Sequence, residues 1–128
     1  MREGHPCILI VEDERMVADA LAGLLSELDL GTCQVARNFE EAVRAAEKHP
    51  PLLIIMDLQL RGGGDGVDAA KKIHEQLDCP IIFTTGNTAP SALLRIFEDK
   101  PSAVLKKPFS PKDLMRAIQT ALRETVEE

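Results

Sequence analysis

Acidic residues follow two apolar runs of this 128-residue sequence. Glu12 and Asp13 come directly after the run at residues 7–11, and Asp57 comes at the end of the run at residues 52–56. Apolar runs of this length, bounded by charged residues, proline or glycine, are typical of strands buried on both faces of a sheet. Because an unpaired carboxylate is costly to bury, we expect Asp57 to lie in the crevice beyond the carboxyl end of its strand.

Carboxylates that converge at one edge of a sheet repel one another, and one pair 4 Å apart costs roughly 4 kcal/mol at an effective dielectric constant near 20. Such a cluster requires a cation, and oxygen ligands at a partly open site favour Mg²⁺. Thr85 and Lys107 follow later apolar runs and can bring a hydroxyl and an ammonium group to the same edge. Beside Mg²⁺ and a lysine, Asp57 can act as a nucleophile toward phosphorus, which gives an aspartyl phosphate.

The elements that must position these groups alternate along the chain. Leu21, Leu25 and Leu28 illustrate the helical spacing of apolar residues that separates the strand-like runs. The predicted strands are residues 7–11, 32–36, 52–57, 81–84 and 103–106, and the predicted helices are residues 17–28, 38–49, 67–77, 91–98 and 111–122. This alternation predicts an α/β fold, a doubly wound sheet of five parallel strands in the flavodoxin-like order 2-1-3-4-5 with five helices. In that order the first and third strands are neighbours, so the three carboxylates meet.

Local signals support the predicted helix ends. Gly31 is placed to end the first helix. Asn38 with Glu41 resembles a capping box at the start of the second. Ser110 as N-cap and Pro111 at the first helical position begin the last helix.

Composition excludes several classes of function. The formal net charge is −6, and the basic residues are scattered, which argues against nucleic acid as a partner. No apolar run approaches the roughly 20 residues that span a bilayer, and no signal peptide is visible, so we expect a cytoplasmic protein without a membrane partner. Cys7, Cys33 and Cys79 lack paired spacing and are expected to be thiols in a reducing compartment. The length fits one domain.

Five short motifs follow one another in a fixed order. They are Glu12-Asp13, Asp57, Asp65-Gly66, Thr85 and Lys107-Pro108-Phe109. Together they resemble the receiver domain of two-component response regulators, and the resemblance extends over residues 7–123. It implies a single receiver domain across residues 1–128, a stand-alone response regulator.

The resemblance also implies the chemistry of the site. In a receiver domain Asp57 would accept a phosphoryl group from a histidine kinase or a histidine phosphotransfer protein. Glu12, Asp13, Asp57 and the backbone carbonyl of Gln59 would hold Mg²⁺. Apart from its own phosphorylation and dephosphorylation, such a protein is not an enzyme.

The output of a receiver domain is a change in its surface. The resemblance implies that Thr85 and Lys107 bind the phosphoryl oxygens and relay the change to the face formed by residues 91–98, 103–106 and 111–122. An unknown downstream protein would bind this face. We expect a monomer, and the sequence leaves open whether phosphorylation drives dimerisation.

The sequence departs from the family pattern at two places, and other functions remain open. Val104 stands where receivers commonly carry tyrosine or phenylalanine, so a phosphorylation-independent docking module of the same fold is the alternative function. The glycine-rich residues 61–64 predict a mobile loop that tightens when metal or phosphate binds. A haloacid-dehalogenase-type phosphohydrolase requires a second acid where Gln59 stands. A flavin site is disfavoured because the chain has no Trp or Tyr to stack on the ring.

Overall fold

The five predicted strands form one sheet in the computed structural model, which describes residues 7–86 and 89–126. The strands are β1 (Cys7–Val11), β2 (Gly31–Ala36), β3 (Leu53–Asp57), β4 (Ile81–Thr85) and β5 (Ala103–Lys106). All neighbours are parallel, and their order is β2-β1-β3-β4-β5. This confirms the predicted flavodoxin-like α/β fold.

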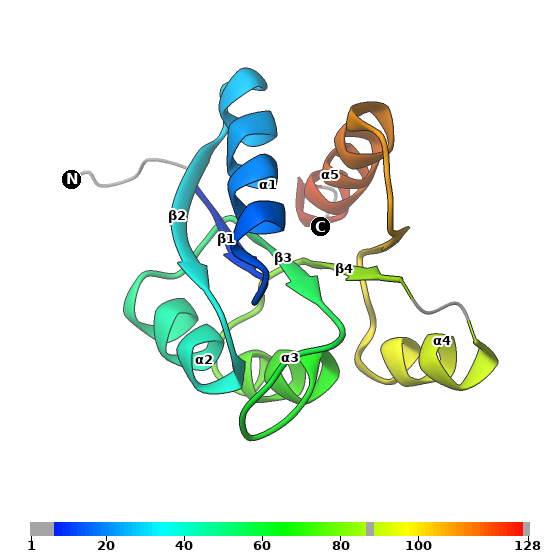
Figure 1. The fold of residues 1–128 in the computed structure, drawn as a ribbon. Coiled ribbons are helices and arrows are strands. Elements are labelled where there is room, and N and C mark those ends of the chain that lie inside the picture. Colours follow the sequence, from blue (N-terminus) through cyan, green and yellow to red (C-terminus); the bar gives the residue numbers. More distant parts are fainter. Residues whose placement is uncertain (1–6, 87–88, 127–128) are drawn as a thin grey trace.

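Helices cover both faces of the sheet. They are α1 (Arg15–Glu27), α2 (Phe39–Lys48), α3 (Gly66–His74), α4 (Pro90–Ile96) and α5 (Pro111–Val126), with a 3-10 turn, η1 (Phe97–Asp99), after α4. Figure 1 shows α1 and α5 on one face of the sheet and α2 and α3 on the other, with α4 beside α3. Within the described ranges, no helix combines the length and the apolar character needed to cross a membrane.

The central position of β3 in the sheet explains why the sequence of this strand is continuously apolar. Ile54 and Met56 of β3 belong to the apolar cluster beneath α2 and α3, whereas Leu53 and Ile55 belong to the cluster beneath α1 and α5. Successive side chains of a strand point to opposite faces. Because both faces are covered by helices, every position of β3 before Asp57 is buried in apolar surroundings.

The first helix ends differently from the prediction. The chain leaves α1 at Glu27 and turns at Asp29, whose φ of 61° is in the left-handed region. Leu30 N–H donates to the carbonyl of Leu25 at 2.8 Å, which closes the helix. Gly31 is instead the first residue of β2. Aspartate takes the left-handed conformation more readily than most residues, so the assignment of the helix end to Gly31 was wrong.

The predicted caps of α2 and α5 are present. The Asn38 side chain accepts from Glu41 N–H at 2.9 Å, although the Glu41 carboxylate accepts from Arg37 N–H instead of from Asn38. Ser110 and Asp113 form a reciprocal pair, each backbone N–H donating to the other side chain at 3.1 Å. These pairs satisfy backbone donors that a helix start leaves without intrahelical partners.

The state of the cysteines differs in part from the prediction of three thiols. Cys7 is disulfide-bonded, so the prediction of three thiols was wrong for this residue. Cys79 is a free and buried thiol, and burial, together with the charge of Asp78, raises its pKa to about 12. The side chain of Cys33 lies outside the part of the chain that the structure describes.

Gly66 begins α3 at a close approach to β3. Its N–H donates to the carbonyl of Leu58 at 2.7 Å, and a Cβ at this position would collide with the carbonyl oxygen of Asp57. By contrast, a Cβ at Gly23, on the exposed side of α1, would meet no atom within 4 Å.

We therefore expect Gly66→Ala to lower the free energy of unfolding by about 1–3 kcal/mol through overpacking. Gly23→Ala, the matched control, is expected to raise it by about 0.5–1 kcal/mol because alanine favours the helix. Urea unfolding followed by far-UV circular dichroism measures both. Equal effects of the two substitutions would contradict the close packing at Gly66.

Candidate functional site

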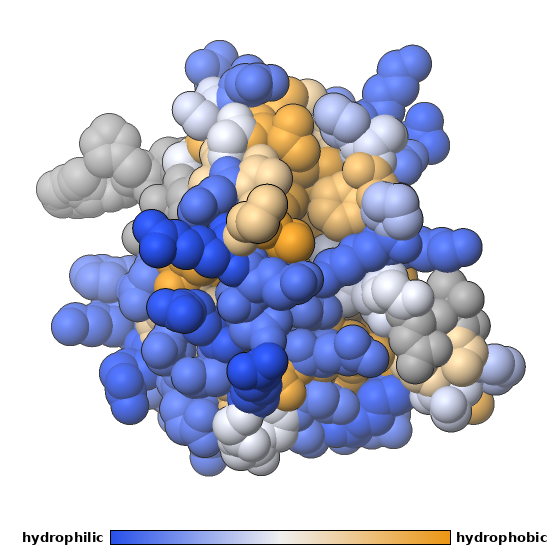
Figure 2. All heavy atoms as spheres, viewed as in Figure 1, coloured by the Kyte–Doolittle hydropathy of each residue, from blue (hydrophilic) through white to orange (hydrophobic). Residues whose placement is uncertain are grey.

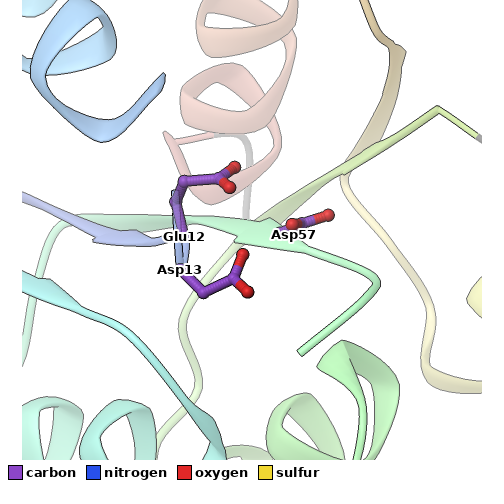
Figure 3. Close-up of side chains that lie close together, drawn as sticks. All are labelled: Glu12, Asp13 and Asp57. Carbon is purple, nitrogen blue, oxygen red and sulfur yellow. The ribbon is translucent and has the colours of Figure 1, made fainter. Parts of the chain in front are cut away.

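Three carboxylates meet at the carboxyl edge of the sheet. Val11 pairs with Met56 across β1 and β3, so the residues after each strand emerge side by side. One oxygen from each of Glu12, Asp13 and Asp57 lies within 4.8 Å of the others. Figure 3 shows Glu12 and Asp13 extending from the end of β1 toward Asp57 at the end of β3. The structure thus brings the predicted acidic residues together.

Burial differs among the three acids. Glu12 and Asp57 are buried, with only 6% of Asp57 exposed, whereas Asp13 is half-buried. The cluster therefore has two inner carboxylates and one on its open side. Such an arrangement gives a metal ion access from solvent while the Asp57 carboxylate stays largely shielded.

Lys107 supplies a positive charge to this cluster. Its Nζ lies 3.0 Å from Glu12 Oε1 and 3.4 Å from Asp57 Oδ2. Lys107 N–H donates to the carbonyl of Thr85 at 2.8 Å, which fastens the loop after β5 to the end of β4. Burial opposes the charge on Lys107, but the hydrogen bond to Glu12 and the attraction of Asp57 raise its pKa overall. The neighbouring Lys106 is exposed.

The environment of Asp57 raises its pKa to about 6 from an ordinary 3.8. Burial is the largest cause, and the negative charge of Glu12 adds to it. Lys107 and the N–H of Gln59, which donates to Asp57 Oδ1 at 3.3 Å, act in the opposite direction. Asp57 is therefore ionised at neutral pH, but its charged form is less stable than that of an exposed aspartate.

The other two predicted residues lie at the same edge. Thr85 is buried at the end of β4, next to Thr84, which pairs with Asp57 in the sheet. The Gln59 side chain is exposed, while its backbone faces Asp57 through the N–H bond. The roles of Thr85 with the phosphoryl group and of the Gln59 carbonyl with a metal stay predictions.

The donor set fits a hard divalent cation. All three side chains offer carboxylate oxygens, and hard cations such as Mg²⁺ prefer oxygen ligands. Among the described residues, the ammonium group of Lys107 stands alone against the two inner carboxylates, so negative charge remains for a cation to neutralise. The acidic cluster can therefore bind a metal ion.

Sequence reasoning missed the residues that hold the loop after β3. Arg61 Nε lies 3.3 Å from Asp13 Oδ2, and the carbonyl of Arg61 accepts from Phe39 N–H at 3.0 Å. Gly63 N–H donates to the Glu40 carboxylate at 2.9 Å. The start of α2 thus holds this loop, which no local motif indicated. That the loop tightens on binding metal or phosphate stays a prediction.

Comparisons with known proteins agree with this geometry. Residues 8–119 match the response regulator receiver domain family. The chain belongs to this family. Receiver domains of response regulators act in two-component signal transduction.

Curated relatives of this receiver domain are longer proteins. The phyllosphere-induced regulator PhyR of Methylorubrum extorquens is 36% identical over 116 residues, which cover 90% of this chain and 43% of PhyR. The transcriptional regulatory protein PdtaR of Mycobacterium tuberculosis is 36% identical over 115 residues, 90% of this chain and 56% of PdtaR. The chain thus spans about half the length of these relatives.

Solved structures share the fold of the receiver domain. The signal receiver domain of a modulated diguanylate cyclase from Desulfovibrio desulfuricans superposes with a TM-score of 0.89 at 34% identity and covers 98% of this chain and 100% of that one. The receiver domain of PhyR from Erythrobacter litoralis has a TM-score of 0.82 at 32% identity, with 94% and 92% covered.

The raised pKa of Asp57 makes stability depend on pH. A carboxyl group whose pKa is higher in the folded state favours folding when protonated, so its penalty grows as pH rises from about 4 to about 6. In EDTA, we expect Asp57→Asn to be more stable than the wild type at pH 7.5 by on the order of 2 kcal/mol. The difference should shrink toward pH 4.

Urea unfolding of both proteins between pH 4 and pH 7.5 measures this difference. Comparing the two proteins cancels the titration of groups that they share. Added Mg²⁺ should stabilise the wild type more than Asp57→Asn, since the variant lacks one carboxylate of the cluster. A difference in stability that is constant with pH would contradict the penalty assigned to Asp57.

Proposed function

We propose that this receiver domain is a phosphoacceptor of a two-component phosphorelay. Asp57 would take a phosphoryl group from the phosphohistidine of a histidine kinase or a histidine phosphotransfer protein in the presence of Mg²⁺. The observation that carries the proposal is the shielded Asp57 carboxylate, which lies close both to the two acids that follow β1 and to the ammonium of Lys107. Membership in the receiver family supports it.

The transfer follows from the groups around Asp57. A carboxylate oxygen of Asp57 attacks phosphorus, the new P–O bond forms as the P–N bond breaks, and the electron pair returns to the donor imidazole nitrogen. With a pKa of about 6, Asp57 is ionised and nucleophilic at neutral pH. Lys107, 3.4 Å from Asp57, would stabilise the phosphoryl oxygens, and the Thr85 hydroxyl would bind another.

Glu12, Asp13, Asp57 and the backbone carbonyl of Gln59 would hold the metal. When bound, Mg²⁺ neutralises charge on the acids and on the transferring phosphoryl group. Residues 7–123 would form the core of a single receiver domain in the cytoplasm, with no enzymatic activity beyond its own phosphorylation and dephosphorylation. Neither nucleic acid nor membrane would be a direct partner.

The output would be a change in the face formed by α4, β5 and α5, which a downstream protein binds. The domain would be a monomer that can dimerise when phosphorylated. Val104, half-buried on β5, lacks the ring through which an aromatic residue would switch. This residue favours the second candidate, a docking module that works without phosphorylation.

Intact mass spectrometry after incubation with acetyl phosphate tests the acceptor function. We expect one added phosphoryl group that requires Mg²⁺ and is absent from Asp57→Asn. Lys107→Ala should label more slowly, by about tenfold or more, because it removes a cation from the transition state. Lys106→Ala is the matched control, because Lys106 is exposed beside the site.

If no adduct forms with acetyl phosphate, the same assay is run with autophosphorylated histidine kinases. Failure to form an adduct with both kinds of donor would contradict the acceptor proposal. The docking module would then be the better account of this domain.

An apolar groove beside the site supports a protein donor. Its volume is about 470 Å³, and it is lined by Met16, Val17, Ala20, Leu21 and Leu24 of α1 and by Lys107, Pro108 and Phe109. Figure 2 shows hydrophobic surface between α1 and α5. Because Lys107 lines the groove and also contacts Asp57, a helix docked there would bring its phosphohistidine to the acceptor.

We therefore expect Met16→Asp to slow transfer from a phosphorylated histidine kinase by about tenfold, since a charge in an apolar contact is costly. Labelling by acetyl phosphate should be unchanged. Leu94→Asp on α4 is the matched control, because both side chains are exposed, Met16 by 84% and Leu94 by 71%. Equal slowing by both variants would contradict docking at α1. Docking at α1 would also be contradicted if Met16→Asp slowed labelling by acetyl phosphate as much as it slowed transfer from the kinase.

A further inference from the structure

Apolar packing holds α4 only lightly. Ala92 and Ile96 are the buried residues of this helix, whereas Leu94 and the following Phe97 are 71% and 63% exposed. A helix that buries one large and one small side chain gains little from the hydrophobic effect. Its position therefore depends on other contacts.

A single arginine provides the strongest of these contacts. Arg95 of α4 donates from Nε and Nη2 to the two carboxylate oxygens of Asp65, both at 3.1 Å. Nη2 also lies 2.5 Å from Asp68 Oδ1, and Nη1 lies 2.7 Å from Glu98 Oε1. Two parallel bonds to one carboxylate make full use of the guanidinium fork. The Arg95 side chain is 28% exposed, so solvent screens this fork less than an open surface pair.

Further polar pairs extend the contact along α3. Lys71 Nζ lies 2.8 Å from Glu98 Oε1. The His74 ring lies between two acceptors, Asp99 Oδ2 at 2.7 Å and the carbonyl of Cys79 at 2.8 Å. The α4–η1 segment is thus attached to α3 by charged and polar groups at three places. We call this set the α3–α4 clasp, made of Arg95 with Asp65 and Asp68, Lys71 with Glu98, and His74 with Asp99.

The anchor of the Arg95 fork is linked to the acceptor residue. Asp65 is the N-cap of α3 and accepts from Asp68 N–H at 2.9 Å. The next residue, Gly66, donates its N–H to the carbonyl of Leu58 and packs against the carbonyl of Asp57. The start of α3 therefore rests on the backbone that follows the acceptor. A shift of this backbone moves Asp65, and a shift of Asp65 disturbs the fork.

We propose that Arg95 couples the state of Asp57 to the position of α4, in the place of an aromatic side chain on β5. The coupling rests on the proposed acceptor function. The fork is suited to this role because its two parallel bonds require a fixed orientation, so a small displacement of Asp65 breaks at least one of them. Val104 offers no ring for this role, whereas the fork joins α4 directly to Asp65 at the start of α3.

Hydrogen exchange of the backbone amides tests the proposal. The protein is compared free and with Mg²⁺ and beryllofluoride, an analogue of the phosphoryl group, and exchange is read at residues 90–99. We expect the wild type to change its exchange there between the two states. In free Arg95→Gln these amides should exchange faster by about tenfold, the factor that losing a hydrogen bond to a charged group corresponds to. The change on adding beryllofluoride should be lost.

Three variants separate coupling from a structural role. Arg95→Lys keeps the charge but not the fork, so it should retain part of the resting protection while losing most of the response. Glu98→Gln leaves the Asp65 fork intact and should keep the response. Arg44→Gln, which changes an exposed arginine of α2, is the matched control and should match the wild type.

Intact mass after acetyl phosphate, measured on the same variants, keeps the two proposals distinguishable. Arg95→Gln should still add one phosphoryl group at Asp57. A wild-type response at residues 90–99 that survives in Arg95→Gln would overturn the coupling. An absent response in a wild type that labels normally would also overturn it. Absent labelling in the wild type would instead overturn the acceptor function.

Discussion

The balance of charge at the carboxyl edge of β1 and β3 is the constraint on which the rest of the structure depends. Neighbouring strands force Glu12 and Asp57 together with Asp13, and their mutual repulsion has to be offset by cations from other segments. Lys107 comes from the loop after β5, 95 residues beyond Glu12. Only a sheet that places the ends of β1, β3 and β5 along one edge brings these charges together. The chemistry of the site therefore requires this order of the strands.

The two kinds of packing in this receiver domain divide it into a firm part and an adjustable part. The strands and the inner sides of α1, α2, α3 and α5 supply most of two apolar clusters, to which α4 adds only Ala92 and Ile96 among the described residues. The α4–η1 segment is attached largely through ion pairs, which are directional and weakened by salt. Segments with few buried apolar contacts open at lower cost than the core. The face proposed for output, formed by α4, β5 and α5, therefore includes a part of the domain that is easy to displace.

Strands were easier to predict than helix ends, for a physical reason. The apolar run at residues 7–11 coincides with β1 because a strand buried on both faces needs an apolar residue at nearly every position. Helix ends depend on backbone conformations that several residue types can adopt. Asp29 rather than Gly31 takes the left-handed turn after α1. The third helix ends at His74, and Leu77 packs against the core from the turn that follows.

The sequence by itself determined the alternation of strands and helices, the order of the sheet, and which acids stand at the strand ends. The alternation and the strand-end acids follow from periodicity and from the cost of burying charge, both of which act locally. The order of the sheet follows from the general rules for parallel sheets with crossover helices. Only the tertiary structure decided the partners of Arg61 and Arg95, because the sequence spacing of exposed charges does not indicate which helices and loops will lie together. The half-buried Lys107 and the exposed Lys106 also show what the sequence suggested and what only the tertiary structure decided. Their neighbours in sequence suggested which lysine faces the acids, but the fold of the loop after β5 brings its Nζ to Glu12 and Asp57.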